Sequence, residues 1–419
     1  MNKFFIKKNP DLIYVLILSL PILAVISILL LELTLLIIST SFLINSFKKK
    51  NFYYFNNLFF KFFSIFYIYI LINFLIQTDS IDTLSIIFYY RYIIYALAIY
   101  YFLDNKEGLF FDFLKVVSIL IIFLGIDAII QFTFKYNILG MEIIEKNRVS
   151  SFFGDELILG SFIFRLLPFV FLTIILDKKF FSKRFSYFLI LLSFLIIFLS
   201  GERVSMILSL FLLIIYFILL KENNVIKNLR VIFIGFIIIV STILTFSKDY
   251  QYRYVLQPFK DLSNSYNVTQ DLLKNYDKEP RIIFFSGLHH NLMITSLRIF
   301  NENKIFGSGP RSYRNICKDY KINRYSCDTH PHNYYLQLLV ETGVVGFSLL
   351  ISLYIFVIKE SFNILRKKKQ KYKVKLCLIG FYISALWPII PSGNIFNNWV
   401  SIMIFLPVPF YLYLSKNTK

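Results

Sequence analysis

Long apolar stretches alternate with short polar segments along the whole of this 419-residue chain. Most stretches are close to the roughly 20 apolar residues that a helix needs to cross the hydrocarbon core of a bilayer. Within a stretch the apolar residues are continuous rather than alternating with polar ones, which excludes a transmembrane β-barrel. The pattern therefore predicts an all-α, polytopic membrane protein.

We predict about twelve transmembrane helices. The first apolar stretch, 12–47, is too long for one helix and contains Pro21 and Glu32, so we interpret it as a hairpin of two helices. The other ten helices are expected at 58–76, 86–103, 110–134, 159–176, 185–200, 204–220, 231–246, 335–358, 376–391 and 399–414. The chain then divides into three parts: membrane helices at 1–247, one large polar loop at 248–333 and further membrane helices at 334–419. A smaller polar loop at 135–156 lies within the first part.

Charges in the connecting segments indicate how the helices are oriented. Lys and Arg total 45 and Asp and Glu total 25, which gives a net charge of +20. In a soluble protein this excess would favour nucleic acid as a partner, whereas in a membrane protein it is expected from the positive-inside rule. With a cytoplasmic N-terminus, the cytoplasmic side receives the basic segments 48–50, 178–184, 221–230 and 366–375. Both termini are therefore predicted to be cytoplasmic, with the large loop on the outer side and no nucleic-acid partner.

The large loop contains all four histidines of the chain, His289, His290, His330 and His332. Histidine is the side chain most often used as a general base near neutral pH, because its unperturbed pKa is about 6.5. The alternative is that these polar residues simply lie outside the membrane. Of the four, we favour His332 as a base.

Two cysteines in the same loop, Cys317 and Cys327, leave a metal site and a disulfide as alternatives. Together with His330 and His332 they have zinc-ligating side chains, but their spacing is not of the paired C-x-x-C type. In an oxidising outer compartment a disulfide is the expected state of two such cysteines. We therefore predict a disulfide, no metal site and no cofactor.

A few charged side chains interrupt the apolar stretches, where a charge costs free energy and is a functional candidate. They are Glu32, Arg91, Arg165, Glu202 and Arg203. Arg203 lies in a tight outer turn, where its guanidinium suits bidentate binding of phosphate; the alternative is a helix-end salt bridge with Glu202. Arg91 and Arg165 fall in the outer halves of their helices and either face the same cavity or reach outer lipid headgroups.

A glycine-rich turn lies upstream of the last two histidines. Residues 307–310 read Gly-Ser-Gly-Pro, with glycines at Gly307 and Gly309, and Arg311 follows. Turns of this type expose backbone N–H groups to anions, although the Gly-Lys-Ser/Thr ending of an ATP-binding loop is absent. With Arg203 and with Arg148 of the smaller loop, Arg311 is a candidate clamp for phosphate groups.

The segment 329–347 closely resembles the signature of the O-antigen ligase family, which includes O-antigen ligases, O-antigen polymerases and related O-oligosaccharyltransferases. The elements of that signature are His-x-His-Asn, Leu-Gln, Glu-Thr-Gly and a second glycine, here at 330–333, 336–337, 341–343 and 346. Three upstream segments are also similar to family features, namely a Gly-x-Gly loop, an Arg-containing outer loop and a Ser-x-Arg turn with one inserted residue, here at 305–310, 147–154 and 200–205.

This resemblance implies a GT-C-like glycosyltransferase in the inner membrane of a bacterium, with its active site facing the periplasm. It implies transfer of a glycan from undecaprenyl pyrophosphate to a hydroxyl of lipid A–core, with an O-antigen polymerase or a protein O-oligosaccharyltransferase as alternatives. His332 and Arg203 would be the catalytic residues. Substrate binding would fall to Arg148, Arg311, His330, Asn333, Gly307, Gly309, Arg91 and Arg165.

One family feature is missing from the chain. Family members often have an Arg and a Trp in the loop helix before the Gly-x-Gly turn, whereas 289–293 reads His-His-Asn-Leu-Met. Any role of that arginine falls to His289, Arg281 or Arg298. A secondary transporter fits less well, because no internal repeat is found and the polar residues concentrate at the outer face. A non-enzymatic assembly protein is a further alternative.

Overall fold

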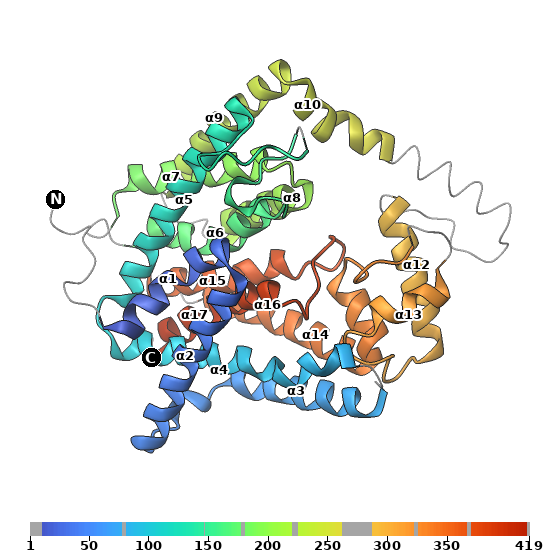
Figure 1. The fold of residues 1–419 in the computed structure, drawn as a ribbon. Helices are drawn as coiled ribbons and strands as arrows, with labels where there is room; N and C mark the ends of the chain where they lie inside the picture. Colours follow the sequence, from blue (N-terminus) through green and yellow to red (C-terminus); the bar gives the residue numbers. More distant parts are fainter. Residues whose placement is uncertain are drawn as a thin grey trace.

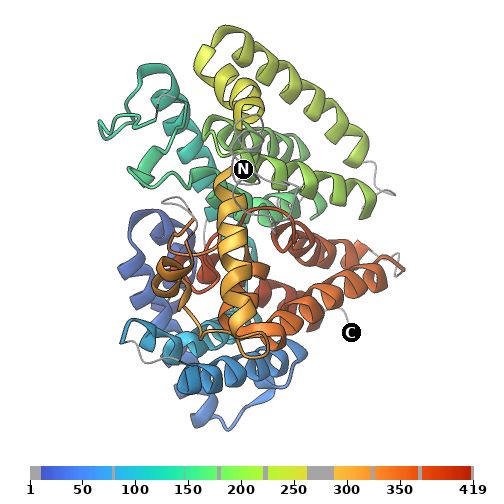
Figure 2. The same ribbon diagram turned by 90° about the vertical axis from the view of Figure 1, so that its right-hand side faces the viewer.

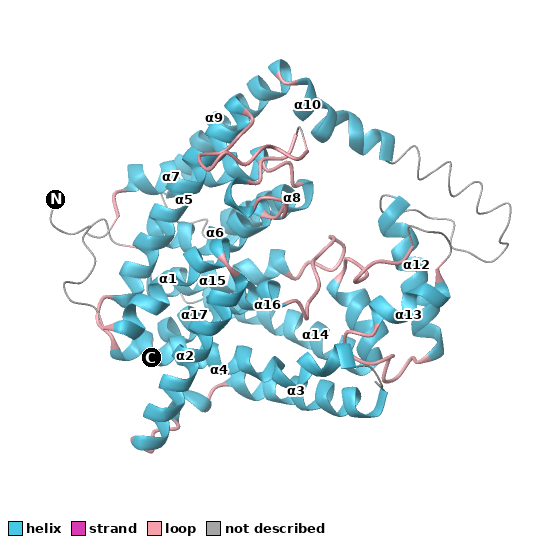
Figure 3. Ribbon diagram, in the orientation of Figure 1, coloured by secondary structure: helices cyan, strands magenta, loops and turns pink. Residues whose placement is uncertain are grey.

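The structure is a computed structural model, and it describes residues 11–77, 81–145, 147–176, 181–219, 225–261, 287–321, 326–366 and 370–416. Over these residues the chain is helical, and Figure 3 shows the helices joined by loops without a strand. Among the loops, an isolated bridge pairs Tyr136 with Glu142 in the small outer loop. The predicted all-α class is therefore confirmed.

Helices form where the apolar stretches predict them. α1 (Leu12–Ile26) and α2 (Ile28–Lys48) are the expected hairpin. The break lies at Ser27, whose hydroxyl accepts a hydrogen bond at the N-terminus of α2, and Pro21 lies inside α1. The helices that follow in the membrane part are α3 (Leu58–Gln77), the 3-10 helix η2 (Ile81–Tyr90), α4 (Arg91–Asn105), α5 (Leu109–Phe134), α6 (Leu159–Ile175), α7 (Lys183–Leu199), α8 (Arg203–Leu219), α9 (Val225–Phe246), α14 (Tyr334–Arg366), α15 (Gln370–Ala385), α16 (Asn398–Phe405) and α17 (Pro407–Lys416).

Six of the described helical segments are long and apolar enough to cross a membrane, and a bent pair, Phe233–Phe246 with Lys248–Asp261, would make a seventh. The helices α1, α6 and α8 are apolar but contain only 15 to 17 residues. A helix of about 20 residues is needed to span the hydrocarbon core. The chain is thus a multi-pass membrane protein, whereas the predicted number of twelve spans is not confirmed.

The centre of the bundle is α6. Nearly all of its side chains are buried, among them Phe162, Phe169 and Phe171, and it packs against α5, α7, α8 and α15 (Figure 1). A helix that is apolar on every side is stable only when other helices or lipid surround it. Because other helices surround α6, its first turn is held in place, and it contacts the turn between α7 and α8.

Three buried charged side chains of α5, those of Asp112, Lys115 and Asp127, were not among the charges predicted to interrupt the apolar stretches. Near the N-terminal end, Nζ of Lys115 lies 2.7 Å from Oδ1 of Asp112, and the Tyr14 hydroxyl donates to the same carboxylate at 2.6 Å. Near the C-terminal end, Asp127 is fully buried and accepts a hydrogen bond from the N–H of Ile138 at 2.9 Å. These partners satisfy charges that would otherwise be costly to bury.

The large loop begins with a sharp corner. The axis of Lys248–Asp261 differs by 107° from that of the end of α9, and we treat this helix as lying outside the spans. It contains α10 (Lys248–Gln251) and the π-helical segment η4 (Tyr252–Leu256), and Figure 1 shows it descending from the top of α9. Further along the loop, α12 (Gly287–Glu302) packs on α13 (Tyr313–Tyr320) and α14, as Figure 2 shows from the side.

Candidate active site

His332 lies just before α14 in an uncommon backbone conformation. Its φ is +55°, in the left-handed region that residues other than glycine seldom adopt. The N–H of Ser392 donates to the His332 carbonyl at 2.8 Å, and the Ser392 hydroxyl accepts from the N–H of Tyr334 at 2.8 Å. Asn333 caps α14, because its Oδ1 accepts hydrogen bonds from first-turn N–H groups at 2.9 and 3.1 Å. These contacts fix the position of His332 and give Asn333 a structural role.

The rings of His330 and His289 lie close to that of His332, with centroid distances of 4.1 and 5.6 Å. Nε2 of His332 is 3.0 Å from Oδ2 of Asp328. His289 belongs to α12, so the fold of the loop brings together residues that are far apart in the sequence. Asp328 was not among the residues predicted from the sequence, although a carboxylate four residues before the favoured base is a local signal for such a pair.

Burial controls the protonation of this cluster. Burial, together with the charges of His332 and Arg203, lowers the pKa of His289 to about 4. Burial and the charge of His332 likewise lower the pKa of His330 to about 4. Burial acts to raise the pKa of Asp328, but hydrogen bonds from His332 and a backbone N–H lower it overall. Near neutral pH, Asp328 is therefore a carboxylate, and His289 and His330 are neutral.

Arg203 is the first residue of α8, and its Nη2 lies 3.1 Å from Oδ2 of Asp261. The alternative for Arg203 was a helix-end salt bridge with Glu202, but the Glu202 carboxylate has other partners. Its carboxylate accepts hydrogen bonds from first-turn N–H groups of α6 at 2.6 and 3.1 Å, and burial raises its pKa to about 7. The charge of Arg203 contributes, after burial and the charge of His332, to the lowered pKa of His289.

Arg148 approaches the same turn from the small outer loop. A Cβ at Gly201, where φ is +66°, would lie only 2.8 Å from Cγ of Arg148, so glycine permits this approach. The Arg148 guanidinium donates to the Leu157 carbonyl at 2.9 Å and lies 3.7 Å from the Glu145 carboxylate. The loop is anchored to α5, because Oε1 of Gln131 accepts two backbone hydrogen bonds from the residues that follow Arg148, at 3.1 and 2.7 Å.

Three other predicted arginines have different contacts. Arg91 makes hydrogen bonds of 3.0 and 3.1 Å with the Glu32 carboxylate, so its charge is balanced inside the protein. The guanidinium of Arg165 donates to a serine carbonyl at 2.8 Å and lies 5.2 Å from the Trp399 ring centre. Arg311 donates to a serine hydroxyl of η2, and burial lowers its pKa. The structure thus brings Arg148 and Arg203 together and gives Arg91, Arg165 and Arg311 other contacts.

The glycine-rich turn packs against a break in α14. The helix is interrupted at Gly343, where φ is 63° and ψ is −167°. The N–H groups of Ser308 and Gly309 donate to carbonyls of α14 just before this break, both at 2.9 Å, and the N–H of Gly307 donates within its own loop at 2.9 Å. The expectation that these groups face an anion is corrected, because all three already have acceptors. Gly307 and Gly309 instead join the loop to α14.

Cys317 and Cys327 form a disulfide with a Cα–Cα distance of 5.3 Å. Cys317 is buried on α13 beside Tyr313, Ile299 and Val340, which form a small core of the loop. The disulfide joins this core to the segment that leads into the histidines. It therefore restricts the backbone on which the proposed base is held.

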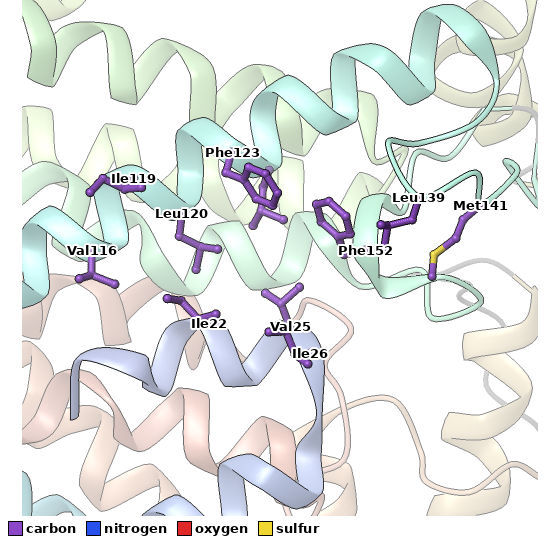
Figure 4. Close-up of a pocket in the computed structure, with 11 residues that line it drawn as sticks. Ile22, Val25, Ile26, Val116, Ile119, Leu120, Phe123, Leu139, Met141 and Phe152 are labelled. Carbon is purple, nitrogen blue, oxygen red and sulfur yellow. The ribbon is translucent and has the colours of Figure 1, made fainter. Parts of the chain in front are cut away.

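An apolar cavity of about 640 Å³ lies between α1, α5 and the small outer loop (Figure 4). The side chains of Ile22 and Val25 line it from α1, those of Leu120 and Phe123 from α5, and that of Phe152 from the loop. Every residue that lines it is apolar, so the cavity suits a hydrocarbon chain and offers no acid or base. The charged and titratable side chains described above lie instead at the histidine cluster and at the turn between α7 and α8.

Among the described residues, no group of three or more His, Cys, Asp or Glu is arranged to hold a metal ion. Comparison with protein families gives one match: residues 188–351 fit a family model described as O-antigen ligase. This range is less than half of the chain, and it includes Arg203 and the histidine cluster. Comparison with curated proteins gives no significant match. The family match supports the assignment that the segment 329–347 indicates by resemblance.

Proposed function

We propose that this chain, whose residues 188–351 fit a family model described as O-antigen ligase, transfers a glycan from undecaprenyl pyrophosphate to a hydroxyl of lipid A–core. The reaction takes place at the periplasmic face of the inner membrane of a bacterium, in a GT-C-like fold. The observation that carries the proposal is that the His332–Asp328 pair lies beside His289, whose pKa is lowered by burial and by the charges of His332 and Arg203. A base and a phosphate-binding cation thus share one site outside the spans.

His332 is the proposed general base. An ionised carboxylate only accepts hydrogen bonds, so the contact of Asp328 with Nε2 of His332 requires the proton on that nitrogen. Nδ1 then carries the lone pair and takes the proton of the acceptor hydroxyl. The hydroxyl oxygen bonds to the anomeric carbon of the glycan while the bond from that carbon to the pyrophosphate oxygen breaks. The electron pair of the broken bond leaves with the pyrophosphate.

Arg203 and Arg148 are proposed to stabilise the leaving pyrophosphate. Negative charge grows on the pyrophosphate as its bond to the glycan breaks, and fixed guanidinium groups stabilise that charge. Balanced charge replaces a general acid at the leaving oxygen, so one base is sufficient. In the structure Arg203 forms a salt bridge of 3.1 Å with the Asp261 carboxylate. The pyrophosphate would take the place of this carboxylate on Arg203.

An O-antigen polymerase is the second candidate, because it would use the same donor, base and cations on a different acceptor. Deletion of the gene distinguishes the two through the surface glycolipids. Loss of a ligase leaves lipid A–core without long chains, and these chains accumulate on the lipid carrier. Loss of a polymerase leaves lipid A–core with one glycan repeat. Unchanged glycolipids in the deletion strain would contradict both functions.

The proposed orientation has its own test. We expect a reporter that is active only in the periplasm to be active when it is fused after Asn264, in the large loop. The same reporter fused at the C-terminus should be inactive, because the terminus is proposed to be cytoplasmic. The reverse pattern would put the histidines on the wrong side of the membrane for this reaction.

Transfer is also proposed to need no metal ion. Purified protein supplied with lipid-linked donor and lipid A–core should keep its activity in excess chelator. Activity that is lost in chelator and restored by a divalent cation would contradict this part of the proposal.

A further inference from the structure

Arg253, on the helix that opens the large loop, contacts the turn between α7 and α8. Its Nε donates to the Gly201 carbonyl at 2.9 Å, and its Nη1 donates to Oε1 of Gln257 at 3.2 Å. In the part of the chain that the structure describes, no carboxylate lies within ion-pair distance of Arg253. It belongs to η4, a π-helical segment, and such segments are frequent at functional sites because the extra residue re-aims neighbouring side chains.

The helix that carries Arg253 is held firmly over the outer end of α7. The hydroxyl of Tyr250 donates to the Leu199 carbonyl at 2.5 Å, and that of Tyr254 donates to the Phe198 carbonyl at 2.7 Å. The rings of Phe198 and Tyr254 also stack, with centroids 4.7 Å apart. Arg253 lies between these two tyrosines, so its backbone is fixed relative to the turn.

The side chains of three arginines therefore meet at or beside this turn: Arg253 donates to the Gly201 carbonyl, Cγ of Arg148 would lie 2.8 Å from a Cβ at Gly201, and Arg203 follows two residues later as the first residue of α8. Burial, together with the charges of Arg148 and Arg203, lowers the pKa of Arg253, and the charge of Glu145 acts in the opposite direction. Nε of Arg148 is buried and makes no hydrogen bond within the described residues. The carboxylate of Glu202, although adjacent in sequence, is engaged by the N-terminus of α6.

Partly buried positive charges that repel one another cost free energy unless an anion binds among them. A guanidinium offers paired N–H donors that match the oxygens of one phosphate group. A diphosphate presents two such groups and more negative charge than a monophosphate. A site with three guanidiniums therefore suits a diphosphate better than a monophosphate.

We propose that Arg253 is the third guanidinium of the donor site and that, with Arg148 and Arg203, it binds the diphosphate of the lipid-linked donor. This inference rests on the proposed function, since it takes the donor to be a lipid-linked diphosphate. It adds a binding residue from a helix outside the resembled motifs, and it makes the corner after α9 part of the donor site.

The test uses the full chain in detergent micelles, with farnesyl diphosphate and farnesyl monophosphate as probes. Arg253→Gln removes the charge but keeps a polar N–H group, and Arg253→Lys keeps the charge but loses the paired donors. Lys260→Gln is the matched control, because it removes a positive charge from the same helix. The Lys260 ammonium lies 5.1 Å from the Tyr252 ring centre. Thermal melting of each variant reports whether the fold is kept.

We expect Arg253→Gln to weaken binding of the diphosphate about 10- to 100-fold, the scale of a lost hydrogen bond to a charged group, and to weaken monophosphate binding less. Arg253→Lys should fall between wild type and Arg253→Gln, and Lys260→Gln should bind as wild type does. Wild-type affinity for both probes in Arg253→Gln, or equal losses in Arg253→Gln and Lys260→Gln, would overturn the role of Arg253 and leave the proposed function intact. If the wild-type chain itself binds neither probe, the proposed donor is wrong and the role of Arg253 is refuted with it.

Discussion

Replacement of Asp328 by Asn tests how His332 is held in its reactive form. The two side chains meet at 3.0 Å and are 43% and 30% exposed, so water competes with their hydrogen bond. A hydrogen bond to a charged partner contributes about 1.5–3 kcal/mol, and the exposure places this pair in the lower part of that range, about 1.5–2 kcal/mol. At about 1.4 kcal/mol for each factor of ten, transfer should slow about 10- to 30-fold. An Asn amide can also donate to Nε2, which favours the tautomer with the proton on Nδ1 and blocks the base.

The assay is single-turnover transfer from labelled undecaprenyl-pyrophosphate glycan, with donor binding measured separately. Asp328→Asn should bind donor normally, because Asp328 contacts the base and not the arginines. Asp319→Asn, which changes an exposed carboxylate of α13 in the same loop, is the control and should transfer at the wild-type rate. His289 and His330 stay neutral from about pH 6 to 8, because both pKa values are about 4. Transfer at the wild-type rate by Asp328→Asn would refute the role given to this pair.

Three further predictions concern the donor site and the loop that holds the base. Arg203→Lys keeps the charge but loses the paired donors, so donor binding and transfer should both be strongly impaired; wild-type behaviour would make Arg203 only a helix-end charge. Cys317 and Cys327 should resist alkylation in protein from intact cells until a reductant is added, and free thiols at both positions before reduction would contradict the disulfide. Gly343→Ala should lower the melting temperature by several degrees, because its Cβ would lie 2.1 Å from a backbone oxygen at a φ of +63°. Gly140→Ala, at a φ of +80° but with open space around it, should cost less, and equal losses would contradict the packing argument.

The helices could be predicted from the sequence because each apolar stretch is a local signal. The predicted and observed ends of α3, α5 and α6 agree to within one residue. The break in the first hairpin was less predictable, since both Pro21 and Ser27 are compatible with a helix end. Ser27 marks the break because its hydroxyl caps α2, whereas Pro21 is accommodated inside α1. The number of spans stays a prediction, because an apolar stretch indicates a helix but not whether that helix is long enough to cross.

The candidate site could be predicted only in part, because its contacts join distant segments. The motif drew attention to His332 and Arg203, but Arg253 carries no local signal that it reaches Gly201, which lies 52 residues earlier. The glycine-rich turn was misinterpreted for the same reason. Its N–H groups are available to an anion only if nothing else accepts from them, and the break at Gly343 supplies acceptors that no local pattern reveals.

The measurement that tests the central claim most directly is donor binding and single-turnover transfer by His332→Ala. If His332 is the general base, this variant should bind labelled undecaprenyl-pyrophosphate glycan nearly as wild type does and transfer it at least about 100-fold more slowly. Raising the pH should restore part of the rate, because hydroxide then replaces the imidazole. If His332→Ala instead loses donor binding, and the complex that still forms reacts at the wild-type rate, His332 is a ligand for the pyrophosphate and not the base.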